Sequence, residues 1–70
     1  MKRVRVESSV LRSVGYDGEG KVLEVEFHDE ERYRYFVVPR RVFEELIGAD
    51  SPGRYFNQQV RDRYPTRQVD

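Results

Sequence analysis

The chain contains no cysteine and only one histidine among its 70 residues. Without cysteine, disulfide bridges, thiolate zinc sites and thiol catalysis are excluded. His28 is predicted to lie in a turn without a second ligand, so a metal site centred on it lacks partners. Ser8 and Ser9 have no histidine at motif spacing to serve as a base. We therefore expect no catalytic residue, no metal site and no cofactor.

Long apolar runs are also missing. No segment approaches the roughly 20 apolar residues of a membrane-spanning helix. The basic amino terminus lacks the apolar stretch of a secretory signal, so we expect a cytoplasmic protein without a membrane segment. The sequence DGEG at residues 17–20 lacks the lysine and the helix of a phosphate-binding P-loop, and no small-molecule substrate is indicated.

Net charge is zero, but the charges are arranged in blocks. Residues 17–31 hold seven acids and one lysine, whereas residues 32–41 hold four arginines and no acid. A second arginine-rich segment runs from Arg54 to Arg67. Arginine suits phosphate groups and aromatic rings better than lysine does, although a GC-rich genome would produce the same bias. Blocks of this kind indicate a binding surface more than the overall charge does.

Alternation of apolar and polar residues predicts an antiparallel three-stranded β-meander. Its strands cover residues 10–16, 22–27 and 32–37, with a turn at residues 17–20. The expected core-facing residues are Val10, Val14 and Tyr16, then Leu23, Val25 and Phe27, then Tyr33, Tyr35 and Val37. If the last two sets share a face, paired residue numbers have an even sum and the hairpin loop has an odd length. A four-residue loop would turn Arg32 and Arg34 toward the core, at a high desolvation cost.

Two short helices are predicted to follow and to cover one face of the sheet. The first begins with Pro39 at its first position and ends near Gly48, and the second is capped by Asp50 or Ser51, opens with Pro52 and continues to Tyr64. The expected inward residues are Val42, Phe43, Leu46 and Ile47 in the first helix, and Phe56, Val60 and Tyr64 in the second. The predicted fold class is therefore α+β in two layers, a single domain of residues 1–70 with a core from about 4 to 65 and a frayed tail after Pro65.

Most of the chain, from Ser8 to Pro65, resembles the KTSC domain family. The similar segments are SSVLRSVGYD, LEVEF, YRYFVVP and ADSPGRYFNQQVRDRYP. The family occurs as small bacterial proteins and at the carboxyl end of some lysyl-tRNA synthetases, with a tyrosine-x-tyrosine motif that Tyr33 and Tyr35 match. The resemblance implies a small domain of unassigned function for which RNA binding is only a proposal. Glu30 departs from the family, whose turn commonly has glycine there.

Arginine and aromatic residues predict an RNA-binding surface, because single-stranded RNA binders use rings for stacking and arginine for phosphate. The candidate residues are Arg32, Arg34, Arg40, Arg41, Arg54, Tyr55, Arg61 and Arg63. The five arginines from Arg40 to Arg63 would form one surface if they converge where the helices start and end. Tyr33 and Tyr35 are predicted to fill the core, which would leave Arg32, Arg34 and Phe36 on the open sheet face beside Glu24 and Glu26.

A second candidate site lies at the start of the second helix. Ser51, Gly53 and Arg54 would bind an anion there, because the first N–H groups of a helix are unpaired and glycine permits a close approach. The alternative is an ordinary capped helix start.

Two interpretations of function stay open. The first is a small non-catalytic module that binds tRNA-like or structured RNA. The second is a protein-interaction or self-association module, such as a homodimer, that uses the open sheet face or a strand edge. Alternating acids and arginines and a near-neutral isoelectric point favour the second, whereas the family resemblance and the arginine clusters favour the first.

Overall fold

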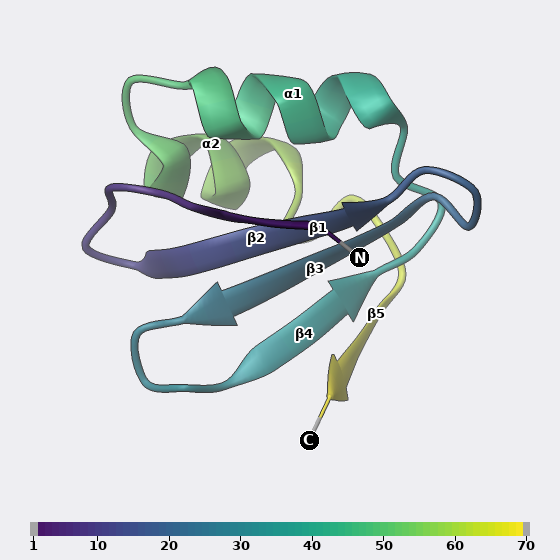
Figure 1. The fold of residues 1–70 in the computed structure, drawn as a ribbon, viewed down its shortest axis with the longest axis horizontal. Helices are drawn as coiled ribbons and strands as arrows, with labels where there is room; N and C mark the ends of the chain where they lie inside the picture. Colours follow the sequence, from purple (N-terminus) through teal and green to yellow (C-terminus); the bar gives the residue numbers. More distant parts are fainter. Residues whose placement is uncertain (1, 70) are drawn as a thin grey trace.

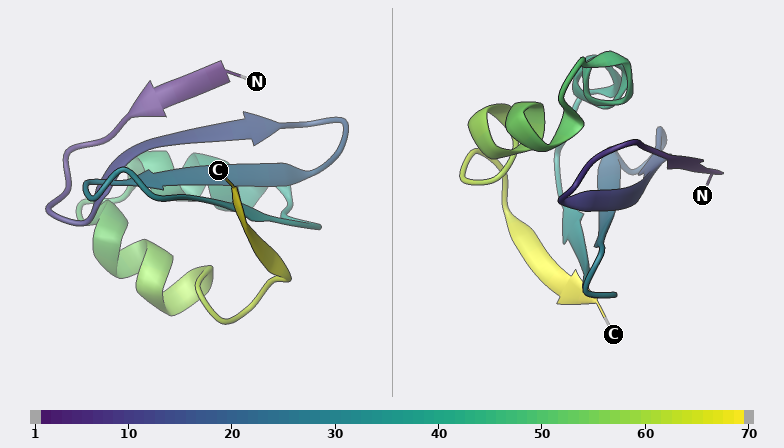
Figure 2. Two further views of the ribbon diagram at one scale, coloured as in Figure 1. Left: turned by 90° about the horizontal axis from the view of Figure 1, so that it is seen from below. Right: turned by 90° about the vertical axis from the view of Figure 1, so that its left-hand side faces the viewer.

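Strands with alternating apolar residues and two short amphipathic helices form two layers in the computed structural model, which describes residues 2–69 (Figure 1). The elements are β1 (Lys2–Arg5), β2 (Leu11–Asp17), β3 (Val22–Phe27), β4 (Arg32–Tyr35), α1 (Arg40–Gly48), α2 (Pro52–Gln59) and β5 (Thr66–Val69). All neighbouring strands are antiparallel, in the order β1-β2-β3-β4-β5. Both helices lie on the same side of this sheet (Figure 2). The α+β class and the two layers are as predicted.

The prediction of three strands was wrong, because the sheet has five. The missed strands, β1 and β5, are each four residues long and located at the two edges of the sheet, and both contain arginine. Short, charged edge strands are common because they discourage pairing with other chains, but they give a weak sequence signal. The tail after Pro65, which we expected to fray, instead pairs with β4 from Tyr35↔Thr66 to Arg32↔Val69. This pairing satisfies backbone groups that β4 would otherwise leave without partners.

The predicted register of the β3–β4 hairpin is confirmed. Leu23 pairs with Tyr35 and Val25 with Tyr33, so paired residue numbers have an even sum. The Phe27 N–H donates to the Glu31 carbonyl at 2.9 Å, which closes a loop of three residues. The third loop residue, Glu30, has a φ of 71°. A left-handed residue at this position is the usual geometry of a three-residue hairpin with a bulge.

The left-handed backbone at position 30 explains why glycine is common in this turn. A residue with a Cβ atom is strained in the left-handed region by about 1 to 2 kcal/mol, and glycine removes this strain. Part of the gain is offset, because glycine has more conformational freedom in the unfolded chain and loses more of it on folding. Glu30→Gly should therefore raise the free energy of unfolding by about 0.5 to 1 kcal/mol, measured by urea denaturation. Glu19→Gly is the matched control, because Glu19 lies in the β2–β3 turn without a positive φ. Equal losses of stability in both variants would contradict the prediction.

Two predicted core positions are occupied by neighbouring residues instead. Val10 is 40% exposed and Leu11 is buried, because the register shifts between Leu11 and Ser13 and reverses the alternation. Val37 is 68% exposed, because β4 ends at Tyr35 and Val37 has a φ of 61°. Val38 fills the core in its place. Both errors come from local backbone irregularities that a period-two pattern does not contain.

Helix α1 begins at Arg40, with Pro39 as its N-cap and not its first residue. Its buried residues are Val42 and Leu46, while Phe43 stacks on Tyr16 with ring centroids 5.3 Å apart. Ile47 was predicted to face inward but is 37% exposed. The helix therefore contacts the sheet through a narrower apolar stripe than its sequence indicates.

Helix α2 begins as predicted and ends earlier. Ser51 is its N-cap, and the Ser51 Oγ accepts a hydrogen bond from the Arg54 N–H at 3.4 Å. The helix ends at Gln59, not Tyr64, since Val60 leaves the helical conformation. A helix continued to Tyr64 would extend about 7 Å further, and the chain could not return to pair with β4.

The core lies between the helices and one face of the sheet. Its buried apolar side chains are Leu11, Val14, Tyr16, Leu23, Val25, Tyr35, Val38, Val42, Leu46, Phe56 and Val60. Tyr35 is 4% exposed and meets Phe56 edge to face, so its predicted core position is confirmed. Tyr33 is half-buried at the margin of the same core.

Candidate nucleic-acid interface

Two rows of side chains cross the sheet on the face opposite the helices. The strand register places Arg3, Gly15, Glu24, Arg34 and Arg67 in one row, and Arg5, Ser13, Glu26, Arg32 and Val69 in the other. Five arginines thus share this surface with two glutamates, which leaves three excess positive charges. We call this surface, defined by Arg3, Arg5, Arg32, Arg34 and Arg67 together with Glu24 and Glu26, the arginine face.

Glu24 organises the centre of the arginine face. Its Oε1 accepts a hydrogen bond from Arg3 at 2.5 Å and its Oε2 accepts one from Arg34 at 2.8 Å. Glu24 is only 7% exposed. Burial by itself raises the pKa of Glu24, but the hydrogen bond from Arg34 and the charges of Arg3, Arg34 and Arg32 together lower it below 4.5. Glu24 is therefore ionised at neutral pH and holds two guanidinium groups in place.

This ion-pair cluster makes part of the stability depend on pH. Because the folded pKa of Glu24 is lowered, the cluster stabilises the protein above the ordinary value of 4.5 and this contribution is lost as the pH falls through the folded value. Glu24→Gln should reduce the free energy of unfolding by about 1 to 2 kcal/mol at pH 7 and by much less at pH 3. Urea denaturation at both pH values measures the difference. Glu44→Gln, on the exposed side of α1, is the control, and an equal effect of Glu24→Gln at both pH values would contradict the prediction.

The remaining arginines of this face are available to a partner. Arg5, Arg32 and Arg67 have no ion-pair partner among residues 2–69. Arg34 binds Glu24, yet 47% of its side chain is exposed, and a guanidinium has five N–H donors. Phe36 continues the alternation of Arg32 and Arg34 and is half-buried outside the core cluster. Continued alternation would place its ring at one end of the arginine face.

Three other predicted RNA-binding residues, Arg40, Arg41 and Tyr55, make contacts within the protein at the helices. The Cζ of Arg40 lies 5.4 Å from the centroid of the Tyr16 ring, and Arg41 pairs with Glu45 at 3.4 Å. The Tyr55 hydroxyl donates to the same Glu45 at 2.7 Å. Burial, together with this hydrogen bond and the charge of Glu45, raises the pKa of Tyr55 to about 12. Tyr55 thus connects α2 to α1, and its ring packs against the core.

The five helix-side arginines do not converge. Arg40 begins α1, whereas Arg54 lies in the first turn of α2, beyond the other end of α1. The length of α1 alone separates them by about 12 Å. Arg61 and Arg63 follow α2, where the Arg63 Nε donates to the Gln58 carbonyl at 3.0 Å. The contributions of these arginines to RNA binding stay predictions.

At the start of α2 the protein itself fills one side of Gly53, while a cleft lined by Ser8, Ser51, Gly53 and Arg54 stays open, so anion binding there stays a prediction. Gly53 is buried, and a Cβ at this position would lie 3.1 Å from the Ser8 Oγ and 3.5 Å from Val10. The close approach that glycine permits is thus made by the segment before β2. The Ser51 Oγ already accepts the N–H of Arg54. The geometry of Ser51, Gly53 and Arg54 is that of a capped helix start packed on a loop.

Ser8 and His28 have structural contacts. The Ser8 Oγ accepts the N–H groups of Val10 and Leu11 at 3.0 and 3.2 Å, and His28 Nε2 lies 2.7 Å from the Ser8 carbonyl. No group of three potential metal-ligating side chains occurs within residues 2–69. In the same part of the chain, every helix is too short and too polar to cross a membrane.

Sequence reasoning found Arg32 and Arg34 but missed Arg3, Arg5 and Arg67. These three lie on β1 and β5, the two strands that were not predicted. The sequence RVRV at residues 3–6 does alternate in polarity, which is the signal that could have found Arg3 and Arg5, whereas TRQV at residues 66–69 has no such alternation.

A five-stranded antiparallel meander with two helices between its fourth and fifth strands defines the class of fold. Residues 7–64 match the family described as KTSC domain. The chain belongs to the KTSC domain family, as its sequence resemblance implies. A KTSC domain protein from Yersinia pestis has a similar structure, with a TM-score of 0.95 and 32% identity, covering 99% of this chain and 97% of that one.

Relatives occur both as small proteins and within a larger one. An uncharacterized protein of Stutzerimonas stutzeri is 52% identical over 64 residues, covering 91% of this chain and 90% of the relative. A protein of Tsukamurella paurometabola is 39% identical over 59 residues, covering 84% and 88% of the two chains. A lysine–tRNA ligase of Nostoc punctiforme is 32% identical over 66 residues, which are 94% of this chain and 12% of the ligase. The domain is therefore similar to a small part of that enzyme.

Proposed function

We propose that the protein is a non-catalytic, cytoplasmic RNA-binding module and that RNA lies across the arginine face. The observation that carries this proposal is the excess of five arginines over two glutamates on one uncovered sheet surface. Guanidinium groups bind phosphate oxygens through pairs of N–H donors. Phe36, at the end of the same face, offers a ring on which a base can stack.

Glu24 has a positioning role in this proposal. Because it orients Arg3 and Arg34 before any ligand arrives, less side-chain entropy is lost on binding. The central acids would otherwise repel phosphate, but Glu24 is buried beneath its two arginines and Glu26 accepts a hydrogen bond from Ser13 at 3.1 Å. The lysine–tRNA ligase among the relatives is by its name an enzyme that acts on an RNA, which supports RNA as the ligand class.

Salt dependence tests the proposal. Fluorescence anisotropy with a short single-stranded RNA and with a tRNA should show binding at low salt. If four to five phosphates are neutralised on a single strand, log K should fall against log salt with a slope of about −3 to −3.5. Absence of binding at low salt, or a slope near zero, would overturn the proposal. A protein partner at the outer edge of β1 or β5 would then become the better hypothesis.

A further inference from the structure

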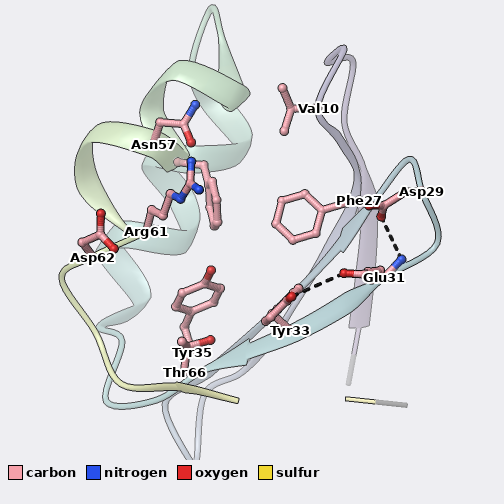
Figure 3. A pocket seen from close by; sticks show the side chains of 11 residues that line it. Val10, Phe27, Asp29, Glu31, Tyr33, Tyr35, Asn57, Arg61, Asp62 and Thr66 are labelled. Carbon is pink, nitrogen blue, oxygen red and sulfur yellow. Dashed lines mark hydrogen bonds between the residues drawn. The ribbon is translucent and has the colours of Figure 1, made fainter. Parts of the chain in front are cut away.

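An aromatic cleft lies on the helix side of the sheet, between the β3–β4 hairpin and the end of α2 (Figure 3). Its volume is about 410 Å³. Phe27 meets Tyr33 and Phe56 edge to face, with ring centroids 5.7 and 5.5 Å apart, and Tyr35 meets Phe56 at 5.5 Å. Phe56 and Tyr35 are almost fully buried, whereas Phe27 and Tyr33 are half-buried. Four rings joined by three edge-to-face contacts thus give the cleft its apolar walls.

Acidic residues stand on both walls of this cleft. Asp29 and Glu31 come from the hairpin, and Asp62 comes from the turn after α2 (Figure 3). Arg61 is the one cationic side chain that lines the cleft within the described part of the chain. The cleft therefore has two excess negative charges, in contrast to the arginine face on the other side of the sheet.

Hydrogen bonds hold the hairpin acids in place. The Asp29 Oδ1 accepts the Glu31 N–H at 3.0 Å, and the Glu31 Oε2 accepts the Tyr33 hydroxyl at 3.3 Å. Burial, and then the charges of Glu31 and Asp29, raise the pKa of Tyr33. The negative field of these acids therefore reaches the aromatic wall.

Aromatic walls with acids above them fit an organic cation. Ring faces attract a cation electrostatically, and carboxylates bind a guanidinium through paired hydrogen bonds. A guanidinium is planar, so it can stack on a ring while its N–H groups reach carboxylates on two sides, which a lysine ammonium does less well. A phosphate group would be repelled, so the RNA of the preceding proposal does not suit this cleft.

We propose that the aromatic cleft binds an arginine side chain of a partner polypeptide, with the half-buried rings of Phe27 and Tyr33 against its alkyl and guanidinium groups and with Glu31 and Asp62 as charge partners. The buried rings of Tyr35 and Phe56 form the floor beneath them. Arg61 also lines the cleft, where its positive charge would repel the partner's arginine. This inference is independent of RNA binding, because it uses the opposite side of the sheet.

A pair of near-isosteric probes tests this assignment. Nα-acetyl-arginine methylamide and Nα-acetyl-citrulline methylamide differ by one charge and are titrated against ¹⁵N-labelled protein. We expect the arginine probe to shift the amide signals of Glu31, Tyr33 and Arg61 at millimolar concentration, and the citrulline probe to bind at least tenfold more weakly. Equal binding of the two probes, or shifts located elsewhere, would overturn the proposal. So would the absence of any shift with 20 mM arginine probe.

Charge variants make the test specific to the cleft. Glu31→Gln and Asp62→Asn should each lower the affinity for the arginine probe about two- to fivefold, as expected for exposed ion pairs. Arg61→Gln should raise this affinity by a similar factor. Glu19→Gln changes the net charge equally in the distant β2–β3 turn and should leave affinity unchanged. If Glu19→Gln weakens binding as much as Glu31→Gln does, the effect is one of net charge and the cleft is not the site.

Discussion

Replacing Tyr35 with alanine is expected to reduce the free energy of unfolding by about 3 to 5 kcal/mol, the range for deleting a buried aromatic ring. Tyr35 is 4% exposed, packs against Phe56 and pairs across the hairpin with Leu23. A domain of this size seldom has more than about 3 to 5 kcal/mol in total. Tyr35→Ala should therefore be largely unfolded at 25 °C, as measured by circular dichroism and urea denaturation.

Two control variants separate the ring from its hydroxyl and from its neighbour. Tyr35→Phe keeps the ring and should cost about 1 kcal/mol or less, because the hydroxyl lies at the cleft beside Thr66. Tyr33→Ala removes a half-buried ring at the margin and should cost clearly less than Tyr35→Ala. An unchanged melting temperature for Tyr35→Ala would mean that Tyr35 is a surface platform and that the core assignment is wrong.

Replacing Arg5, Arg32 and Arg67 together with glutamine should weaken RNA binding about 100-fold at 0.1 M salt, because three fewer phosphates are neutralised. The salt slope should fall in magnitude by about 2. These three arginines have no ion-pair partner among residues 2–69, so the fold should be little affected. Anisotropy titrations at several salt concentrations, with circular dichroism as a check on folding, measure both quantities.

The matched control is a helix-side triple variant with the same change in charge, in which Arg40, Arg41 and Arg54 are replaced with glutamine. These residues were candidates from the sequence, but they lie on the helices and not on the arginine face. The control should retain most of the affinity and the slope of the unmodified protein. If the helix-side variant loses as much as the sheet-face variant, the contacts depend on overall charge and the arginine face is not the RNA site.

The sequence predicted best those features that depend on regular alternation. The β3–β4 register followed from the cost of turning Arg32 and Arg34 inward, and it is confirmed. The sequence failed where the backbone is irregular or the signal short. Because of a register shift after Leu11 and a left-handed conformation at Val37, the buried residues at these two places are one position away from those predicted. The two edge strands are only four residues long, which is too short for a pattern of alternation to be detected.

The candidate sites were predicted only in part, because long-range packing decides them. Gly53 looked available to an anion, but Ser8 and Val10, more than 40 residues earlier, fill the space beside it. The aromatic cleft combines the hairpin, the end of α2 and the start of β5. No pattern in the local sequence predicts that Glu31 and Asp62 line the same cleft. Such sites follow from the tertiary fold and not from spacing along the chain.

The position of β5 has a consequence for how the protein matures on the ribosome. Residues 66–69 are synthesised after the other elements that the structure describes, yet they complete the outer edge of β4 and bring Arg67 beside Arg34. Until they emerge, the nascent chain has an unprotected strand edge next to the hairpin. A ribosome-bound chain arrested before Thr66 would thus carry four of the five arginines of the arginine face and an unpaired strand edge, so residues 66–69 both protect this edge and complete the charge pattern of the face.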